Sequence, residues 1–410
     1  MRPPRSALLL PAAVLLVAGA SRLAAQPPLR TFILPDGLRV VLREDQGRLL
    51  FRARLRLALH PGDLPPGREG LADLALRMLD RGEAGHLGAA AFDRALDDGG
   101  IRLERSLTAD ALTWDLVSRS RDQDRALGLL ADRLLRPVLD PSALEPERLA
   151  CWRDQEAALA APAARLDAAL GLGGPPPATE QSLGQLAFAD LETFLRRVFR
   201  PDRALLVLEG DLGLEQAKAL VLLTLGTWTG EAVPAAGPAA PAAPVPPLPA
   251  RIADPGAALR VEAAVPPPGD LDPALRDLAV LILRHDPTLA DVLVREAPGG
   301  TLRFTLRAQA PGADAALAAL RARLAALAGR GCTGADLDRA KAAWAEAQRV
   351  LALHPEALLA RDLRDAEGRA ARPEAVAAAT PAALGAALAG WLDPARIRWA
   401  VVGDPASLRP

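Results

Sequence analysis

The side chains that could bind a metal or act as a nucleophile are few, and they are scattered along the chain. The four histidines are His60, His86, His285 and His354. None has a second histidine or a glutamate at the spacing that places two zinc ligands on one helix face. There is no Gly-x-Ser-x-Gly elbow and no phosphate-binding loop. We therefore expect surface or hydrogen-bonded histidines, with His354-Pro355-Glu356 starting a helix.

The two cysteines, Cys151 and Cys332, lie in different halves of the chain. Export would permit a disulfide, but no motif brings the two residues together. We expect two separate buried thiols, and the sequence leaves their pairing open.

The stretch from Gly70 to Glu83 has the pattern of an amphipathic helix that follows a Pro/Gly-rich loop. Its apolar residues recur at helical spacing, and Gly82 supplies a stop signal. Asp73 and Arg77 lie one turn apart on this helix. The simplest prediction is therefore an ion pair on the helix surface.

Periodic segments on both sides of this helix predict the elements that position it. A β-hairpin is expected over 31–45, with its turn at Asp36-Gly37, and a strand over 50–59. Further strands are expected at 101–106, 111–118 and 204–209, and helices at 88–98, 122–135, 141–161, 188–199 and 214–225.

Landmarks of the first half recur in the second at a nearly constant offset, which predicts an internal duplication. They are Leu127 with Leu317 (190 residues), Arg148 with Arg339 (191) and Gly210 with Gly403 (193). Strands and helices do not alternate regularly within either half. The predicted fold class is therefore α+β: two homologous domains, each an antiparallel-rich sheet with helices packed on one face.

Composition suggests the domain boundaries. Arg2 and Arg5 precede a short apolar run that ends in small residues, so we expect a signal peptide over 1–25, with an uncleaved anchor as the alternative. A Pro/Ala-rich linker is expected over 231–250, between an N-terminal domain (29–230) and a C-terminal domain (251–408). No later segment predicts a membrane span, and the net charge of −1 gives no case for nucleic-acid binding.

Taken together, these segments resemble the pitrilysin/insulinase family of zinc metallopeptidases, particularly the two-domain type that includes mitochondrial processing peptidase. The matching pieces are 34–42 (Leu-Pro-Asp-Gly-Leu-Arg-Val-Val-Leu), 70–83, 200–211, 226–228, 293–296, 336–341 and 402–404. The resemblance extends over almost the whole chain after the predicted signal peptide. It implies two similar α+β domains that face each other across a peptide-sized cavity.

The resemblance also shows what is missing from the 70–83 helix. Active members carry His-x-x-Glu-His there, with two zinc ligands and a general base, and a distant glutamate completes the site. Asp73, Leu76 and Arg77 stand at those three positions, and the distant ligand falls near Asp154 or Glu156. Leucine cannot accept a proton, and arginine stays charged and repels a dication. We therefore expect no metal, no cofactor and no catalytic residue, although active relatives bind zinc.

One peptide-binding feature is retained in part. In active members the second domain supplies an arginine and, seven residues later, a tyrosine that hold the substrate peptide. Arg295 matches the arginine, but Leu302 stands at the tyrosine position. Arg295 is therefore a candidate peptide-binding residue, with an exposed arginine at a helix end as the plain alternative.

These observations favour an exported, non-catalytic homologue, periplasmic or extracellular. It would bind peptide, or pair with an active zinc-bearing paralogue as a heterodimer and complete that enzyme's chamber. Two alternatives are an active metallopeptidase with displaced ligands and a structural component of an envelope complex.

Overall fold

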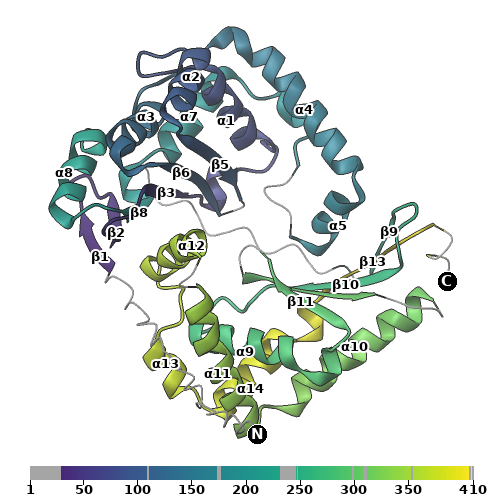
Figure 1. Cartoon of the computed structure of the whole chain (residues 1–410). Coiled ribbons are helices and arrows are strands. Elements are labelled where there is room, and N and C mark those ends of the chain that lie inside the picture. The colour runs from purple at the N-terminus through teal and green to yellow at the C-terminus, as the bar shows by residue number, and fades with distance from the viewer. Residues whose placement is uncertain are drawn as a thin grey trace, which may run out of the picture.

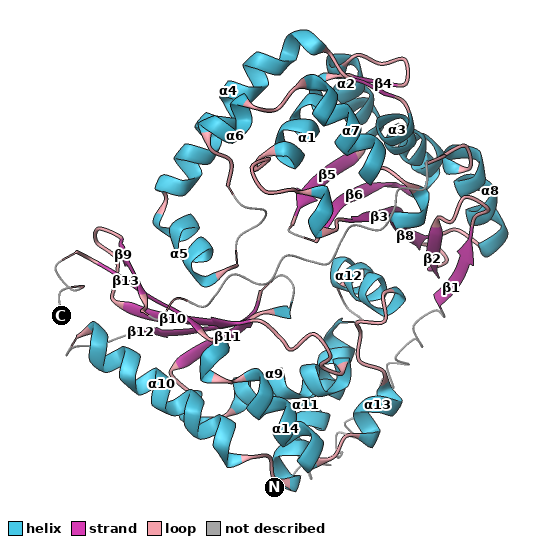
Figure 2. Cartoon of the chain, turned by 180° about the vertical axis from the view of Figure 1, so that it is seen from behind, coloured by secondary structure: helices cyan, strands magenta, loops and turns pink. Residues whose placement is uncertain are grey.

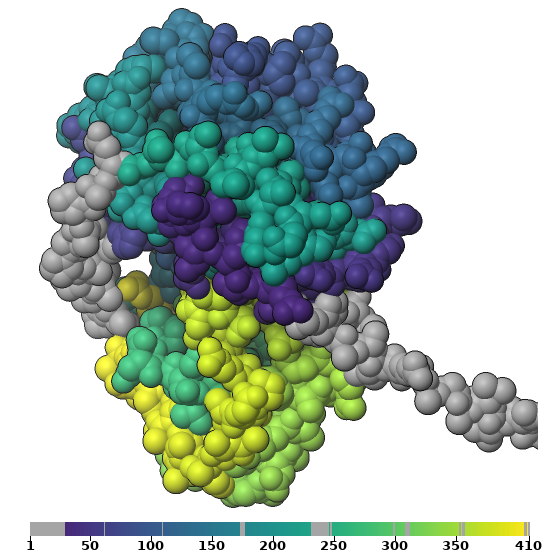
Figure 3. All heavy atoms as spheres, turned by 90° about the vertical axis from the view of Figure 1, so that its left-hand side faces the viewer, coloured from purple at the N-terminus to yellow at the C-terminus, as the bar shows by residue number. Residues whose placement is uncertain are grey.

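The computed structural model describes residues 29–108, 110–172, 177–230, 246, 248–297, 300–307, 312–351, 354–405 and 408. The predicted signal peptide and most of the predicted linker lie outside the described residues. The described chain forms two lobes, one from each half of the sequence, which stand against each other in Figure 3.

The first half builds a six-stranded sheet in the order β1-β2-β8-β3-β6-β5 (Figure 1). Its strands are β1 (Leu29–Ile33), β2 (Arg39–Glu44), β8 (Ala204–Gly210), β3 (Leu50–Ala58), β6 (Ala111–Arg119) and β5 (Arg102–Leu107). Every neighbouring pair is antiparallel except β2 and β8. On β3 the period-2 pattern turns Phe51, Leu55 and Leu57 into the core, while the arginines between them face the other side.

The helices of this half are α1 (Leu71–Arg81), α2 (Ala89–Gly99), α3 (Gln123–Leu135), α4 (Leu144–Ala160), α5 (Pro162–Leu170), α6 (Glu180–Gly184), α7 (Phe188–Val198) and α8 (Leu214–Leu225). Two short strands, β4 (Glu83–Ala84) and β7 (Pro137–Val138), pair with each other. α1 packs against α4 and α7, and its apolar face belongs to the main core of this half.

The second half builds a five-stranded sheet in the order β11-β12-β10-β13-β9. Its strands are β11 (Val292–Glu296), β12 (Leu302–Arg307), β10 (Arg260–Val265), β13 (Arg398–Gly403) and β9 (Ala250–Ala253). Its helices are α9 (Pro273–His285), α10 (Ala313–Arg330), α11 (Gly334–Leu351), α12 (Pro355–Ala366), α13 (Pro373–Ala378) and α14 (Pro381–Trp391). Figure 2 shows the helices α9, α10, α11 and α14 gathered on one side of this sheet.

The two sheets share a topology. The order β2-β8-β3-β6-β5 in the first matches β9-β13-β10-β12-β11 in the second, and in both the first pair alone is parallel. Trp114 and Phe304, 190 residues apart, occupy matching positions on β6 and β12, opposite Leu55 and Ala263. The predicted α+β class is confirmed, and the two halves share one sheet topology, while the duplication stays a prediction.

One helix from each half crosses to the sheet of the other half. α12 packs on β8 and β2, where Leu359 and Leu363 join an apolar cluster with Val207. α5 packs on β13 and β9, where Leu166 and Leu170 form the matching cluster. Each sheet therefore has its own helices on one face and a single helix of the other half on the opposite face.

Both cysteines are free thiols, as expected. Cys151 is fully buried, but Cys332 is only half-buried, so the expectation of burial is wrong for Cys332. It lies in the short loop between α10 and α11, where its thiol donates to the carbonyl oxygen of Thr333.

Candidate functional site

The region expected to hold zinc in active relatives is formed by α1 and α4. Gly70 precedes α1 with φ 88°, and a Cβ at this position would lie 2.5 Å from the Cβ of Ala178. Only glycine fits there, because the conformation is left-handed and the neighbouring chain is too close. This start aims Asp73 and Arg77 of α1 toward α4, where Asp154 lies.

Arg77 lies between two carboxylates. Its Nε is 3.3 Å from Asp73 Oδ2, one turn back on the same helix. Its Nη1 is 2.9 Å from Asp154 Oδ2, across on α4. The predicted Asp73–Arg77 pair is thus confirmed, and Asp154 is its third member. Glu156, the other candidate for the distant ligand, is exposed and makes no ion pair among the described residues.

These contacts fix the charge of the site. Burial alone would lower the pKa of Arg77, but the nearby carboxylates, Asp73 first, outweigh burial and the pKa is raised. The guanidinium therefore stays protonated at every physiological pH. A divalent cation would have to displace a fixed positive charge that already satisfies both carboxylates. This donor set does not fit zinc.

Leu76 occupies the position expected for the general base. On a helix it lies about 60° from Asp73, yet its side chain is fully buried in the main core of the first half. It contributes packing and no acid–base chemistry. In the structure, Leu76 packs in the core, and Asp73 and Arg77 form an ion pair on helix α1.

Cys151 and Gln155 complete the surroundings of Asp73, and the sequence did not predict their role. The Cys151 thiol and the Gln155 amide each donate to Asp73 Oδ2 at 3.3 Å. Gln155 Oε1 accepts from the backbone of Ala178 at 2.5 Å. Burial, and then the charge of Asp73, raise the pKa of the Cys151 thiol to about 12. Cys151 is therefore a neutral hydrogen-bond donor and a poor nucleophile or metal ligand. The spacing of Cys151, Asp154 and Gln155 along one helix face is the signal that could have grouped them.

The histidines lie apart from this site. His354 precedes α12 as its N-cap, as expected. His285 Nδ1 contacts the carbonyl oxygen of Leu281 at 2.8 Å, and His60 Nδ1 is 3.6 Å from Asp63. Among the described residues, no group of three or more His, Cys, Asp and Glu side chains could hold a metal ion.

Arg295 lies on β11, the edge strand of the second sheet, and its side chain is exposed. The interpretation as a helix-end arginine is wrong, because the run Val-Leu-Val-Arg-Glu is a strand paired with β12. Leu302, at the position of the missing tyrosine, is fully buried. Arg295 makes no ion pair with any residue that the structure describes, so it is available to a ligand.

The edge of the first sheet is open beside α1. β5 is the last strand in the sheet order and pairs only with β6. Its Arg105 bonds to Asp80 of α1, with Nη2 and Oδ2 2.7 Å apart. An extended peptide that paired with β5 would therefore run directly past α1 and Arg77.

Comparison with known proteins identifies the fold. No family model and no curated protein sequence matches the chain. The fold matches an inactive M16 peptidase domain from Pseudomonas fluorescens, with a TM-score of 0.73 at 19% identity, over 93% of this chain and 99% of that one. The chain has the M16 peptidase fold.

Two further solved structures agree with this assignment. A protease from Helicobacter pylori matches with a TM-score of 0.73 at 16% identity, over 93% of this chain and 100% of that one. The periplasmic protease PqqL from Escherichia coli matches with a TM-score of 0.67 at 14% identity, over 93% of this chain but 46% of that one. M16 is the pitrilysin/insulinase type of peptidase, so the predicted resemblance is confirmed at the level of fold.

Proposed function

We propose that this chain is an exported, non-catalytic protein of the M16 peptidase fold. It binds an extended peptide along β5 and completes the chamber of an active, zinc-bearing relative as a heterodimer. In this role the chain recognises peptide, and the partner carries out hydrolysis.

The observation that carries the proposal is the position of Arg77. Its guanidinium spans Asp73 and Asp154 across α1 and α4, at the place where the resemblance puts zinc. This partly exposed ion pair and the packing between α1 and α4 join the two helices, so the surface beside β5 keeps its shape without a metal. Under this proposal, peptide binding persists in a chain that does not hydrolyse the peptide.

The open edge of β5 supports peptide binding. Its outer backbone groups have no strand partner, and such an edge accepts an extended peptide by main-chain hydrogen bonds. The ion pairs Arg102–Glu104 and Arg105–Asp80 hold its charged side chains in place. The exposed Arg295 on β11 is the candidate contact from the second half.

Two comparisons support the role of a partner subunit. A solved protein of this fold is itself described as an inactive M16 domain. This chain also spans about half the length of the periplasmic protease PqqL, so a second unit of similar size would complete an assembly of that size. No helix among the described residues is long and apolar enough to cross a membrane.

The test is capture of the tagged chain from envelope extract, with zinc measured on the chain alone and on the captured complex. We expect no zinc on the chain alone, and zinc with peptide hydrolysis in a complex that contains an M16 peptidase. Stoichiometric zinc and hydrolysis by the chain alone would show instead an active metallopeptidase with displaced ligands. Capture of an unrelated envelope assembly, without a peptidase, would indicate a structural component.

A further inference from the structure

A pocket with a cavity volume of 500 Å³ opens on the helix side of β5, next to α1. Its walls come from α1, α2, α3, α4, β5 and β6. The apolar part of the lining is Phe92, Leu96, Leu103 and Trp114. Because Leu103 belongs to the edge strand β5, a peptide paired with that strand would pass the mouth of the pocket. Alternate side chains of an added strand point to this side of the sheet.

Arg133 of α3 lies within this pocket and is 4% exposed. Its guanidinium stacks over the ring of Phe92, 4.0 Å from the centroid, and its Nη1 donates to the carbonyl oxygen of Leu79 at 2.5 Å. No carboxylate lies within ion-pair distance of it among the described residues. Burial lowers the pKa of Arg133, which means that the buried positive charge is destabilised. A bound anion would stabilise this charge.

Most other charges around the pocket are already paired. Asp80 Oδ2 is 2.7 Å from Arg105 Nη2, and Glu147 Oε1 is 2.6 Å from Arg81 Nε. Each of these pairs is neutral as a unit.

Asp93 is the remaining carboxylate of the lining, and it is exposed to solvent. Water screens a charge at the mouth far more than a charge in the interior. Asp80 and Asp93 offset part of the burial of Arg133, but burial outweighs them and the pKa of Arg133 stays lowered, so Arg133 remains a buried cation that faces the pocket.

We propose that this pocket binds a carboxylate of the peptide that lies along β5, with Arg133 as the residue that binds the carboxylate and the apolar wall receiving the carbon chain. The inference rests on the proposed function, because it assigns a specificity to the same peptide groove. The carboxylate belongs either to the C-terminus of the peptide or to an aspartate or glutamate side chain, since both present the same two oxygens.

Arg133 also supports α1 through its bond to Leu79, and the two roles are compatible. The guanidinium has five N–H donors, and the bond to Leu79 uses one nitrogen. The other two nitrogens, Nε and Nη2, remain to pair with the two oxygens of a carboxylate. A purely structural arginine would contribute to stability but would not distinguish an acid from its amide.

The test uses four N-acetylated hexapeptides of one apolar sequence: the free acid, the C-terminal amide, the amide with one internal glutamate and the amide with glutamine at that position. Binding to the intact chain is measured by titration calorimetry at 0.15 M salt. We expect one acid to bind roughly 10- to 100-fold more tightly than its neutral twin, the range for a buried charge-assisted hydrogen bond. The pair that shows the difference identifies the source of the carboxylate.

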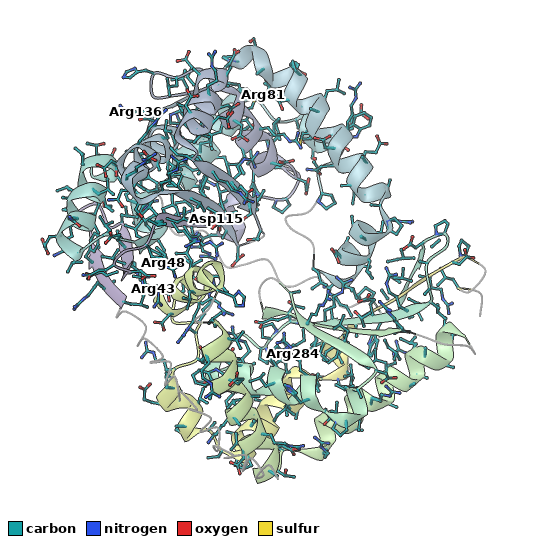
Figure 4. All side chains as sticks on the ribbon, viewed as in Figure 1. Arg43, Arg48, Arg81, Asp115, Arg136 and Arg284 are labelled. Atoms are coloured by element: carbon teal, nitrogen blue, oxygen red, sulfur yellow. The ribbon has the colours of Figure 1, made fainter. Side chains whose placement is uncertain are left out.

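Arg133→Gln should abolish this difference, and Arg133→Lys should restore part of it. Arg136→Gln is the matched control, because Arg136 follows the same helix, is 59% exposed and pairs with Asp132 (Figure 4). It should leave the difference unchanged. If peptides bind but acids and amides bind equally, or if the difference survives in Arg133→Gln, the carboxylate assignment is wrong while peptide binding stands. If no peptide binds, the proposed function fails, and this inference fails with it.

Discussion

The contact between α12 and the first sheet depends on a buried ion pair, which allows a quantitative prediction. Arg43 of β2 bonds Asp362 of α12 through Nε–Oδ2 at 2.7 Å and Nη2–Oδ1 at 2.5 Å. The side chains are 5% and 2% exposed, and Figure 4 shows Arg43 beside α12. In Arg43→Met, the carboxylate of Asp362 stays buried without its cation. Breaking one side of such a pair costs about 3–5 kcal/mol.

That loss is comparable to the contribution of the leucines that α12 packs on the first sheet. Leu359 and Leu363 are the buried leucines that α12 places on the sheet. Burying a leucine contributes about 1.5–3 kcal/mol, so the two contribute about 3–6 kcal/mol. We therefore expect Arg43→Met to release α12 from the sheet while the two main cores stay folded.

The assay is hydrogen–deuterium exchange of backbone amides, followed by mass spectrometry. Amides of α12 and of the facing strand β8 should lose protection in Arg43→Met, while those of α1 and α14 keep theirs. The double variant Arg43→Met/Asp362→Leu should recover the protection, since an apolar pair of similar size often replaces a buried ion pair without loss. Unchanged protection of α12 in the single variant, or no recovery in the double variant, would refute this reasoning.

Three further predictions concern single side chains. Leu76→Glu puts a carboxylate into a closed apolar core, so it should lower the free energy of unfolding by about 3 kcal/mol or more, measured by urea unfolding at pH 7. The control Leu76→Met should lower it by less than about 1.5 kcal/mol. The pKa of Cys151 is about 12, so this thiol should resist iodoacetamide at pH 8 in the folded chain, while the half-buried Cys332 reacts. Equal labelling of the two cysteines, measured by mass spectrometry, would contradict the assignment of Cys151 as a neutral, unreactive thiol. Burial raises the pKa of Glu209, so its charged form is disfavoured in the fold. Glu209→Gln should therefore raise the midpoint of thermal unfolding at pH 7–8. This rise should become smaller as the pH drops through the raised pKa toward about 4.5. A rise in the midpoint that grows on acidification would contradict the predicted direction.

Periodicity predicted the elements whose apolar faces meet within one half. The hairpin over 31–45 is β1 and β2, and the 70–83 helix is α1, which ends at Gly82. Each has a clear pattern, because one of its faces packs in the core of its own half, even where the partner lies far along the chain, as α7 does from α1.

The packing of α5 and α12 on the opposite sheet was not predicted, although His354-Pro355-Glu356 was expected to start the helix that is α12. The apolar leucines of α5 and α12 contact the opposite sheet, so nothing in the local sequence distinguishes these helices from surface segments. Arg295 was misplaced for a related reason. A five-residue run such as β11 is too short for its period to separate an edge strand from a helix end.

The contact of the candidate site within one helix could be predicted from the sequence, but its contacts between helices could not. An acid and a base one turn apart predict a pair, and Asp73–Arg77 follows from the sequence alone. The third member, Asp154, depends on how α4 crosses α1, and the sequence reached it only through the resemblance. Cys151 and Gln155 join the site through the same crossing, so they were missed.

In the proposed non-catalytic role, Arg77 supplies the positive charge between α1 and α4. The resemblance implies that in active relatives a metal joins α1 to α4. Without a cation, Asp73 and the more exposed Asp154 would repel each other weakly through solvent, while the packing between α1 and α4 would remain. Arg77 supplies one positive charge to both carboxylates, at 3.3 and 2.9 Å. Under this proposal, the positive charge between the two helices belongs to a side chain that cannot activate water. The open edge of β5 beside α1 then remains in place, which is the condition that peptide binding without hydrolysis requires.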